Sequence, residues 1–143
     1  MRILAFDLGK RRIGLALTDP LGYTAQGLNT FERTNIREDI SLLSALMAEK
    51  EVSLMLFGNP LHMSGDESRQ TEYVKIFADR LSAATGVPYE MWDERLTTAE
   101  AQRVLRSSDM SIQRRGEVID RLAAVLILQS WLDAQGRVGD DRD

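Results

Sequence analysis

Three acidic residues stand at points of the sequence where a charge is unexpected. Asp7 lies inside the apolar run "ILAFDLG", and Glu94 ends the segment "VPYEMWDE". Asp120 has alanine or isoleucine at i+3, i+4 and i+7, so it lies on the apolar face of a C-terminal helical pattern. Because an unpaired buried carboxylate is costly, each of these acids must be paired, exposed or bound to a cation.

Gathered around one point, three carboxylates would repel and would need a cation between them. Carboxylate oxygens suit Mg²⁺ or Mn²⁺, and two such ions about 4 Å apart can activate a water and stabilise the leaving oxygen in phosphodiester cleavage. The chain has no cysteine and a single histidine, His62, which excludes thiolate and histidine-rich metal sites. We therefore predict that Asp7, Glu94 and Asp120 are catalytic residues that bind Mg²⁺ or Mn²⁺, with two ions at the site.

Each acid also has a simpler interpretation when it is taken alone. Asp7 could be a turn residue, and Glu94 could be a surface charge at the end of a strand. Asp120 could be the buried partner of an arginine, or could lie exposed at a helix start, where the helix dipole favours an acid. These alternatives stay open for each residue, and the metal site rests on the three positions coming together.

The surrounding pattern predicts the elements that would position these acids. Apolar segments predict five strands, at 2–9, 12–19, 23–32, 52–58 and 87–94. Helical spacing predicts one helix that starts near Asn35 and another that ends at Gly86. Two more helices are expected, one opening at the capping box Thr97–Glu100 and one over 116–134.

This order of elements predicts an α/β fold. The first three strands form an antiparallel meander, and two αβ units add two strands parallel to the first, giving a five-stranded mixed sheet flanked by helices. Ligands gather at the carboxyl ends of parallel strands. That rule selects Asp7, the turn at 58–60 and Glu94.

Basic residues accompany all three acidic positions. The net charge of −4 and the pI of about 5.1 argue mildly against a nucleic-acid partner, but the distribution of charge favours one. A solvated surface is the alternative for any single basic residue. The residues predicted to bind nucleic acid are Lys10, Arg11, Arg12, Arg95, Arg114 and Arg115.

The length of 143 residues fits one domain, expected over 1–136, followed by a disordered acidic tail at 137–143. Asp7 interrupts the first apolar run, so no secretory signal is expected, and the apolar run at 118–128 is too short to span a bilayer. These features predict a cytoplasmic protein with no membrane partner.

Four segments in order resemble the YqgF (RuvX) family of pre-16S rRNA nucleases, also described as Holliday-junction-resolvase-like. They are "LAFDLGKRRIGLALTD" (4–19), "GNPLHMSGDES" (58–68), "DERLTTAEA" (93–101) and "IDRLAAVLILQSWL" (119–132). The resemblance implies a ribonuclease H-like fold, with Asp7, Glu94 and Asp120 as the acidic metal-binding set.

Four further residues are expected to support the site from its loops: Gly9, Asn59, Pro60 and His62. Gly9 would allow a tight turn after Asp7. The family often has Leu-Pro-Leu-Asn where this chain has Asn59-Pro60-Leu61-His62, so loop contacts can differ here.

The leading hypothesis is a metal-dependent endonuclease that processes the 5′ end of pre-16S rRNA. The alternative substrate is branched DNA, and a Holliday junction resolvase would act as a symmetric homodimer. Two hypotheses come from other classes, namely a non-catalytic rRNA-binding factor and a fragment of an actin-like ATPase. The last is suggested by "DLGKRRIGLALTD", which also resembles the first phosphate loop of those enzymes, but 143 residues leave no room for their second lobe.

Overall fold

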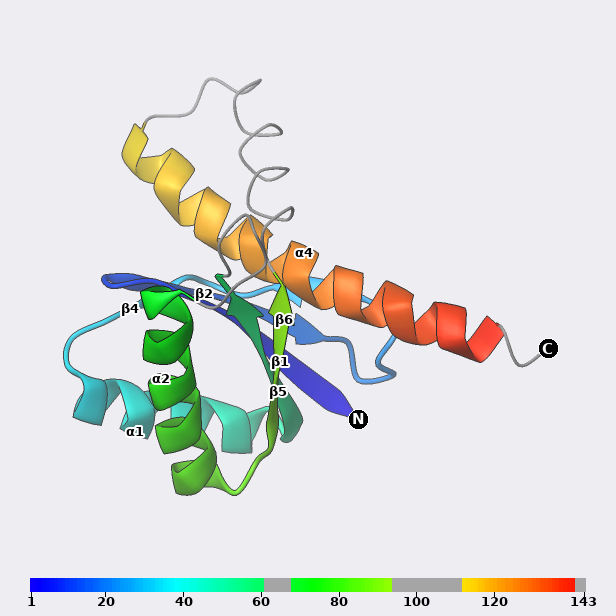
Figure 1. Ribbon diagram of the computed structural model, residues 1–143, viewed down its shortest axis with the longest axis horizontal. Helices are drawn as coiled ribbons and strands as arrows, with labels where there is room; N and C mark the ends of the chain where they lie inside the picture. The colour runs from blue at the N-terminus through cyan, green and yellow to red at the C-terminus, as the bar shows by residue number, and fades with distance from the viewer. Residues whose placement is uncertain (61–67, 94–111, 141–143) are drawn as a thin grey trace.

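A computed structural model describes residues 1–60, 68–93 and 112–140, and shows one mixed sheet with helices on both faces (Figure 1). The strands are β1 (Arg2–Leu8), β2 (Arg12–Thr18), β3 (Ala25–Gly27), β4 (Phe31–Glu32), β5 (Val52–Asn59) and β6 (Tyr89–Asp93). The helices are α1 (Ile36–Glu49), α2 (Arg69–Thr85) and α4 (Ile112–Asp140).

The sheet has the order β3-β2-β1-β5-β6, and β4 also pairs with β2. β1 and β2 are antiparallel, whereas β1–β5 and β5–β6 are parallel. This arrangement confirms the predicted mixed sheet. It also places the carboxyl ends of β1, β5 and β6 at one edge, as the sequence pattern indicated.

The predicted third strand is divided into two short strands, which corrects the expectation of one strand over 23–32. β3 ends at Gly27 opposite Ala16, and β4 begins at Phe31 opposite Ile13. Two residues of β2 lie between those pairs, whereas three residues, 28–30, lie between them on the other side. The extra residue cannot pair in register, so the ladder is interrupted as in a β-bulge.

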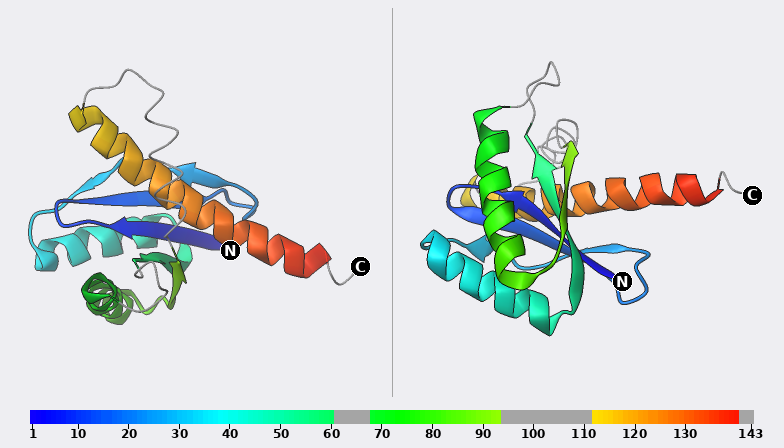
Figure 2. Two further views of the ribbon diagram at one scale, coloured as in Figure 1. Left: turned by 45° about the horizontal axis from the view of Figure 1, so that its top comes forward. Right: turned by 60° about the horizontal axis from the view of Figure 1, so that its bottom comes forward.

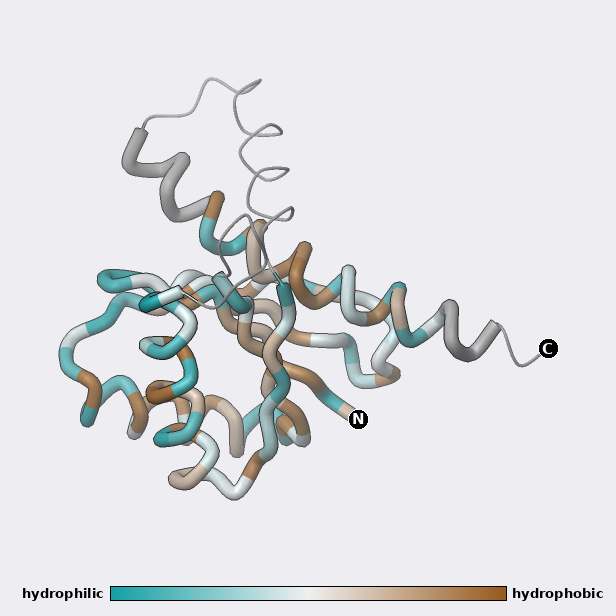
Figure 3. Tube along the Cα trace, in the orientation of Figure 1, coloured by the Kyte–Doolittle hydropathy of each residue, from teal (hydrophilic) through white to brown (hydrophobic). Residues whose placement is uncertain are grey.

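The helices form two layers, with α1 and α2 on one face of the sheet and α4 on the other (Figure 2). Successive side chains of a strand point to opposite faces. In β1, Leu4 and Phe6 pack in the α1/α2 core, while Ile3 and Ala5 pack against α4. Both faces of β1 are therefore buried, which explains its nearly continuous apolar run (Figure 3).

Local capping signals mark the start of α1 and both ends of α2. The Asn35 side chain accepts a hydrogen bond from the Glu38 N–H at the start of α1, as predicted. Ser68 and Thr71 form a reciprocal capping box at the start of α2. Gly86 ends α2 in the left-handed conformation, with φ of 75°, which also confirms the prediction.

α4 is longer than predicted at both ends. It runs over 112–140 rather than 116–134, and so includes residues 137–140 of the segment expected to be disordered. A helical glycine costs only about 1 kcal/mol relative to alanine, so Gly136 without a following proline does not stop the helix.

The helix predicted from Thr97 lies outside the described residues. Within the described part of the chain, no helix is long and apolar enough to cross a membrane.

Candidate functional site

Asp7 lies at the carboxyl-terminal end of β1, on the face of the sheet that α4 covers. It follows Ile3 and Ala5 in the alternation of the strand, and both of those residues pack against α4. Asp7 pairs with Gly14 of β2, and paired residues on antiparallel strands project to the same face. The carboxylate is therefore directed to the α4 side of the sheet, at the carboxyl end of the strand, next to the apolar core.

Gly14 brings α4 directly onto this strand pair. A β-carbon added to Gly14 would lie only 1.9 Å from the carbonyl oxygen of Asp120. Only glycine permits such an approach, so the backbone at Asp120 rests on the residue paired with Asp7. Asp7 and Asp120, which are 113 positions apart in the sequence (120 − 7), are thus brought to the same place.

The apolar face of α4 is the one that the sequence predicted. Ala123, Ala124, Ile127 and Trp131 are buried against the sheet. Asp120 continues this face toward the edge, where its side chain keeps 24% of its surface exposed. The Asp120 carboxylate is therefore partly accessible to solvent, although its helix packs on the sheet.

Arg12 forms an ion pair with Asp120. Its Nε donates to Asp120 Oδ2 at 2.8 Å, and the Arg12 side chain is 32% exposed. Asp120 therefore has an arginine partner, as one of its alternatives expected, but the pair is partly exposed rather than buried. Arg12 was predicted as a nucleic-acid contact, and in the structure its side chain contacts Asp120.

The β1–β2 turn holds the other two cations that follow Asp7. Gly9 N–H donates to the Arg12 carbonyl at 2.9 Å, and a β-carbon on Gly9 would lie 2.6 Å from that oxygen. The tight turn therefore requires glycine, as the sequence predicted for the turn after Asp7. Lys10 and Arg11 are exposed beside it.

The end of β5 is tied to the start of α2. Thr71 Oγ1 donates to Asn59 Oδ1 at 2.9 Å, and Ser68 Oγ donates to the Pro60 carbonyl at 2.7 Å. Asn59 and Pro60 thus fix the capping box of α2 to the carboxyl end of the strand. His62, the fourth predicted supporting residue, lies outside the described residues.

Two polar contacts fasten β6 to α4. Trp92 Nε1 donates to Ser130 Oγ at 3.1 Å, and Trp131 Nε1 donates to Glu90 Oε2 at 3.0 Å. Glu90 and Trp92 therefore face α4, and Asp93 lies on the opposite face by alternation.

Glu94 is the next residue in the chain after β6, but Glu94 and Arg95 lie outside the described residues. Arg114 and Arg115 belong to α4, and their side chains are likewise not described.

The donor set that the structure describes fits a hard divalent cation. Asp7 and Asp120 offer carboxylate oxygens at one edge, which suits Mg²⁺ or Mn²⁺. Among the described residues, no group of three acidic, histidine or cysteine side chains could hold a metal. A complete three-carboxylate site would thus need Glu94.

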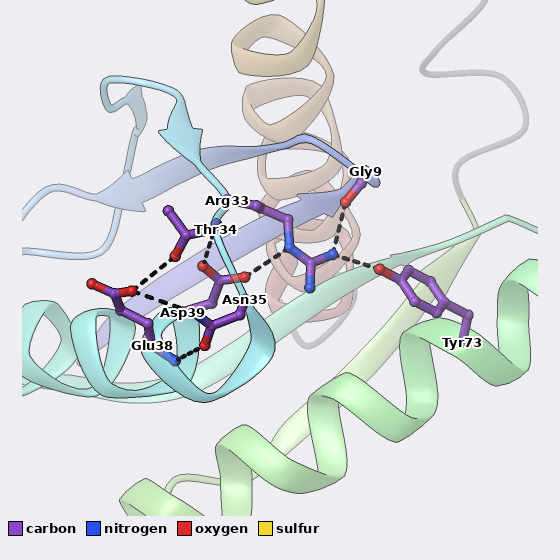
Figure 4. Close-up of polar contacts among 7 residues, drawn as sticks. All are labelled: Gly9, Arg33, Thr34, Asn35, Glu38, Asp39 and Tyr73. Atoms are coloured by element: carbon purple, nitrogen blue, oxygen red, sulfur yellow. Dashed lines mark hydrogen bonds and ion pairs between the residues drawn. The ribbon is translucent and has the colours of Figure 1, made fainter.

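Sequence reasoning did not identify Arg33 and Asp39, which lie close to this site. Arg33 Nε donates to Asp39 Oδ2 at 3.0 Å, and Arg33 Nη1 donates to the Gly9 carbonyl at 2.9 Å (Figure 4). The only sequence signal is an acid in the first turn of α1, which normally indicates an exposed residue favoured by the helix dipole.

Comparison with known proteins agrees with the resemblance of the sequence motifs. A protein from Koribacter versatilis (strain Ellin345), named "Putative pre-16S rRNA nuclease", is 52% identical over 135 residues, covering 94% of this chain and 88% of that protein. A protein of the same name from Myxococcus xanthus (strain DK1622) is 47% identical over 134 residues, covering 94% and 89%.

Solved structures of resolvases share the fold. The Fowlpox virus resolvase in complex with Holliday junction DNA superposes with a TM-score of 0.57 at 8% identity, covering 94% of this chain and 99% of that chain. RuvC of T. thermophilus in complex with a Holliday junction gives a TM-score of 0.53 at 14% identity, covering 95% and 96%.

The family model "RuvX: Holliday junction resolvase" matches residues 1–134. That range contains β1 with Asp7, the glycine turn, the end of β6 and the part of α4 that carries Asp120. The chain therefore belongs to the RuvX family, and its sheet and helices have the ribonuclease H-like arrangement of the resolvases.

Proposed function

We propose that this protein is a divalent-metal-dependent endonuclease that hydrolyses phosphodiester bonds in structured nucleic acid. The observation that carries the proposal is the convergence of Asp7 and Asp120 through Gly14, at the carboxyl edge of the parallel strands. Ligands bind at this edge in open α/β sheets. The family assignment and the names of the relatives support a nuclease.

Asp7, Glu94 and Asp120 would hold Mg²⁺ or Mn²⁺, with two ions at the site. When bound, the ions lower the pKa of a coordinated water and stabilise the charge that develops on the phosphate. Asp7 is held by the strand, and Asp120 by the packing of α4 on Gly14, so both carboxylates are positioned by rigid elements. Glu94 acts either as a ligand or as the group that orients the water.

The basic residues would bind the phosphodiester backbone. Lys10 and Arg11 are exposed on the turn that follows Asp7, and two exposed cations beside a proposed metal ligand support this role. Arg12 compensates the charge of Asp120, to which it donates a hydrogen bond. Arg95, Arg114 and Arg115 are proposed as further contacts from the segments that flank β6 and begin α4.

The 5′ end of precursor 16S rRNA is the proposed substrate, because relatives at 52% and 47% identity carry the name "Putative pre-16S rRNA nuclease". Branched DNA is the second candidate, favoured by the description of the family model as a Holliday junction resolvase. A junction resolvase cuts two symmetry-related strands, so the second candidate also requires a homodimer. Either substrate fits a cytoplasmic protein.

One experiment tests both the mechanism and the substrate. The wild type and Asp7→Asn are incubated with a pre-16S leader RNA and with a synthetic four-way junction, in Mg²⁺, Mn²⁺ or EDTA at matched salt. We expect cleavage of the RNA by the wild type with either metal, and none in EDTA or with Asp7→Asn. Asp133→Asn is the matched control, because Asp133 is exposed on α4 and outside the site.

Each other outcome has a defined meaning. Cleavage that survives EDTA or Asp7→Asn contradicts the metal mechanism. Cleavage of the junction alone, together with a dimer in solution, replaces the first substrate with the second. Binding of RNA without cleavage of either substrate supports a non-catalytic rRNA-binding factor instead.

A further inference from the structure

Arg33 joins four parts of the fold at a point next to the β1–β2 turn. It follows β4, and its guanidinium contacts Asp39 of α1, the Gly9 carbonyl and the hydroxyl of Tyr73 on α2 (Figure 4). The function proposed above gives Arg33 no role, so its contacts require a separate explanation.

The guanidinium is held in a fixed orientation. The side chains of Arg33 and Asp39 are only 9% and 1% exposed, and their ion pair is 3.0 Å long. The second oxygen of Asp39, Oδ1, accepts the Thr34 N–H at 3.0 Å. The Arg33 guanidinium carbon also lies 5.1 Å from the centre of the Phe77 ring. Ion pair, hydrogen bonds and ring contact together leave this planar group little freedom to rotate.

The same residue anchors both ends of the Lys10–Arg11 dipeptide. The Arg33 side chain donates to the Gly9 carbonyl at 2.9 Å, immediately before Lys10. The Arg33 backbone N–H donates to the Arg11 carbonyl, also at 2.9 Å. The largely buried Arg33 thus holds the turn in place, while the side chains of Lys10 and Arg11 remain exposed.

We propose that Arg33 is a positioning residue that fixes the β1–β2 turn so that Lys10 and Arg11 meet the nucleic-acid backbone in a preset geometry. The proposal rests on the function above only in that nucleic acid is the ligand. A turn ordered before binding loses less conformational entropy when it binds. Without Arg33, the protein would have to order the turn and its side chains when it binds. The usual free-energy cost of ordering one or two side chains corresponds to about 3- to 30-fold weaker binding.

A purely structural role for Arg33 makes a different prediction. If Arg33 only stabilised the fold, its substitution would affect binding independently of Lys10 and Arg11, and the two effects would add. If Arg33 acts through the turn, its effect on binding depends on Lys10 and Arg11. A displaced turn weakens binding only while the turn still carries these two cations. A double-mutant cycle separates the two roles.

The experiment measures binding of the pre-16S leader RNA, and separately of the four-way junction, by fluorescence anisotropy in an Asp7→Asn parent, which keeps both substrates intact. Arg33→Lys preserves the charge next to Asp39 but removes the planar fork that reaches Asp39, Gly9 and Tyr73 together. Arg37→Lys is the matched control, because Arg37 is exposed on α1. We expect about 3- to 30-fold weaker binding for Arg33→Lys and no change for Arg37→Lys.

In a parent that also carries Lys10→Gln and Arg11→Gln, Arg33→Lys should have no further effect. Backbone NMR order parameters of Lys10 and Arg11 in the unbound protein should fall with Arg33→Lys and remain high with Arg37→Lys. Two variants keep the test decisive if Arg33→Lys does not fold. Gly9→Ala distorts the turn directly, and Tyr73→Phe removes one partner of the guanidinium; each should weaken binding in the same coupled way.

The two proposals fail in distinguishable ways. If the parent binds RNA and Arg33→Lys binds equally well, or if its effect adds fully to that of the turn substitutions, the positioning role of Arg33 is refuted and the nuclease proposal stands. If the parent binds neither the RNA nor the four-way junction, the nucleic-acid function is refuted, and this inference with it.

Discussion

The α-carbon of Gly14 lies against the backbone of Asp120, so closely that a β-carbon would stand 1.9 Å from the Asp120 carbonyl oxygen. Gly14 is also the residue paired with Asp7 across β1 and β2. A single glycine therefore sets the separation between the strand that carries one acid and the helix that carries the other.

Gly14→Ala tests this close approach. The methyl group forces α4 away from β2, and overpacking of this kind typically costs about 1–3 kcal/mol of unfolding free energy. We expect a lower free energy of unfolding in urea denaturation. We also expect the cleavage activity to fall by more than the fraction of folded protein does. Gly136→Ala is the matched control, because nothing lies within 4 Å of a β-carbon there. Equal behaviour of the two variants would contradict the role assigned to Gly14.

Arg12→Gln tests the ion pair at the site. Since both side chains are partly exposed, the pair should contribute no more than about 1 kcal/mol to stability. Removing the guanidinium 2.8 Å from Asp120 Oδ2 removes a competing cation, so Mn²⁺ should bind the free protein more tightly. Titration calorimetry measures this affinity. The exposed Arg11 provides the control, since Arg11→Gln should change it less, and equal shifts would refute the competition.

Asp39→Asn tests the buried pair beneath the turn. The amide leaves the Arg33 guanidinium, only 9% exposed, without its countercharge. Breaking a buried pair by neutralising one partner typically costs about 3–5 kcal/mol, which urea denaturation would detect. The neighbouring Glu38 is exposed, so Glu38→Gln should stay within about 0.5 kcal/mol. A similarly small effect for Asp39→Asn would show that the pair does not stabilise the fold.

Tyr89 and Asp79 link β6 to α2 and predict a pH dependence. The Tyr89 hydroxyl donates to Asp79 Oδ1 at 2.6 Å, and this hydrogen bond raises the pKa of Tyr89 to about 12. Because the folded-state pKa lies above the ordinary value of 10.0, the stabilisation is complete below pH 10 and is lost as the pH rises toward 12.

Absorbance titration of a Tyr23→Phe/Tyr73→Phe variant leaves Tyr89 as the only tyrosine and follows its ionisation directly. Asp79→Asn should lower the pKa of Tyr89, whereas Glu72→Gln, at another exposed acid of α2, should leave it unchanged. No shift with Asp79→Asn would assign the raised pKa to another cause.

Local patterns in the sequence determined most of the elements. The strands β1, β2, β5 and β6, the cap at Asn35, the end of α2 at Gly86 and the buried face of α4 all followed from spacing and capping residues. These signals extend over a few residues, and the physical causes, alternation and helical periodicity, act over the same range. Asp7 and Asp120 were identifiable because a carboxylate on an apolar face violates such a pattern.

Only the tertiary structure decided which residues meet. The extra residue that divides the third strand is visible only from the pairing of β3 and β4 with β2. The Arg12–Asp120 pair joins residues 108 positions apart, and the Gly14 contact depends on where α4 crosses the sheet. The burial of Asp39 likewise depends on Arg33 reaching it. Such contacts arise from how whole elements pack, which no short stretch of sequence specifies.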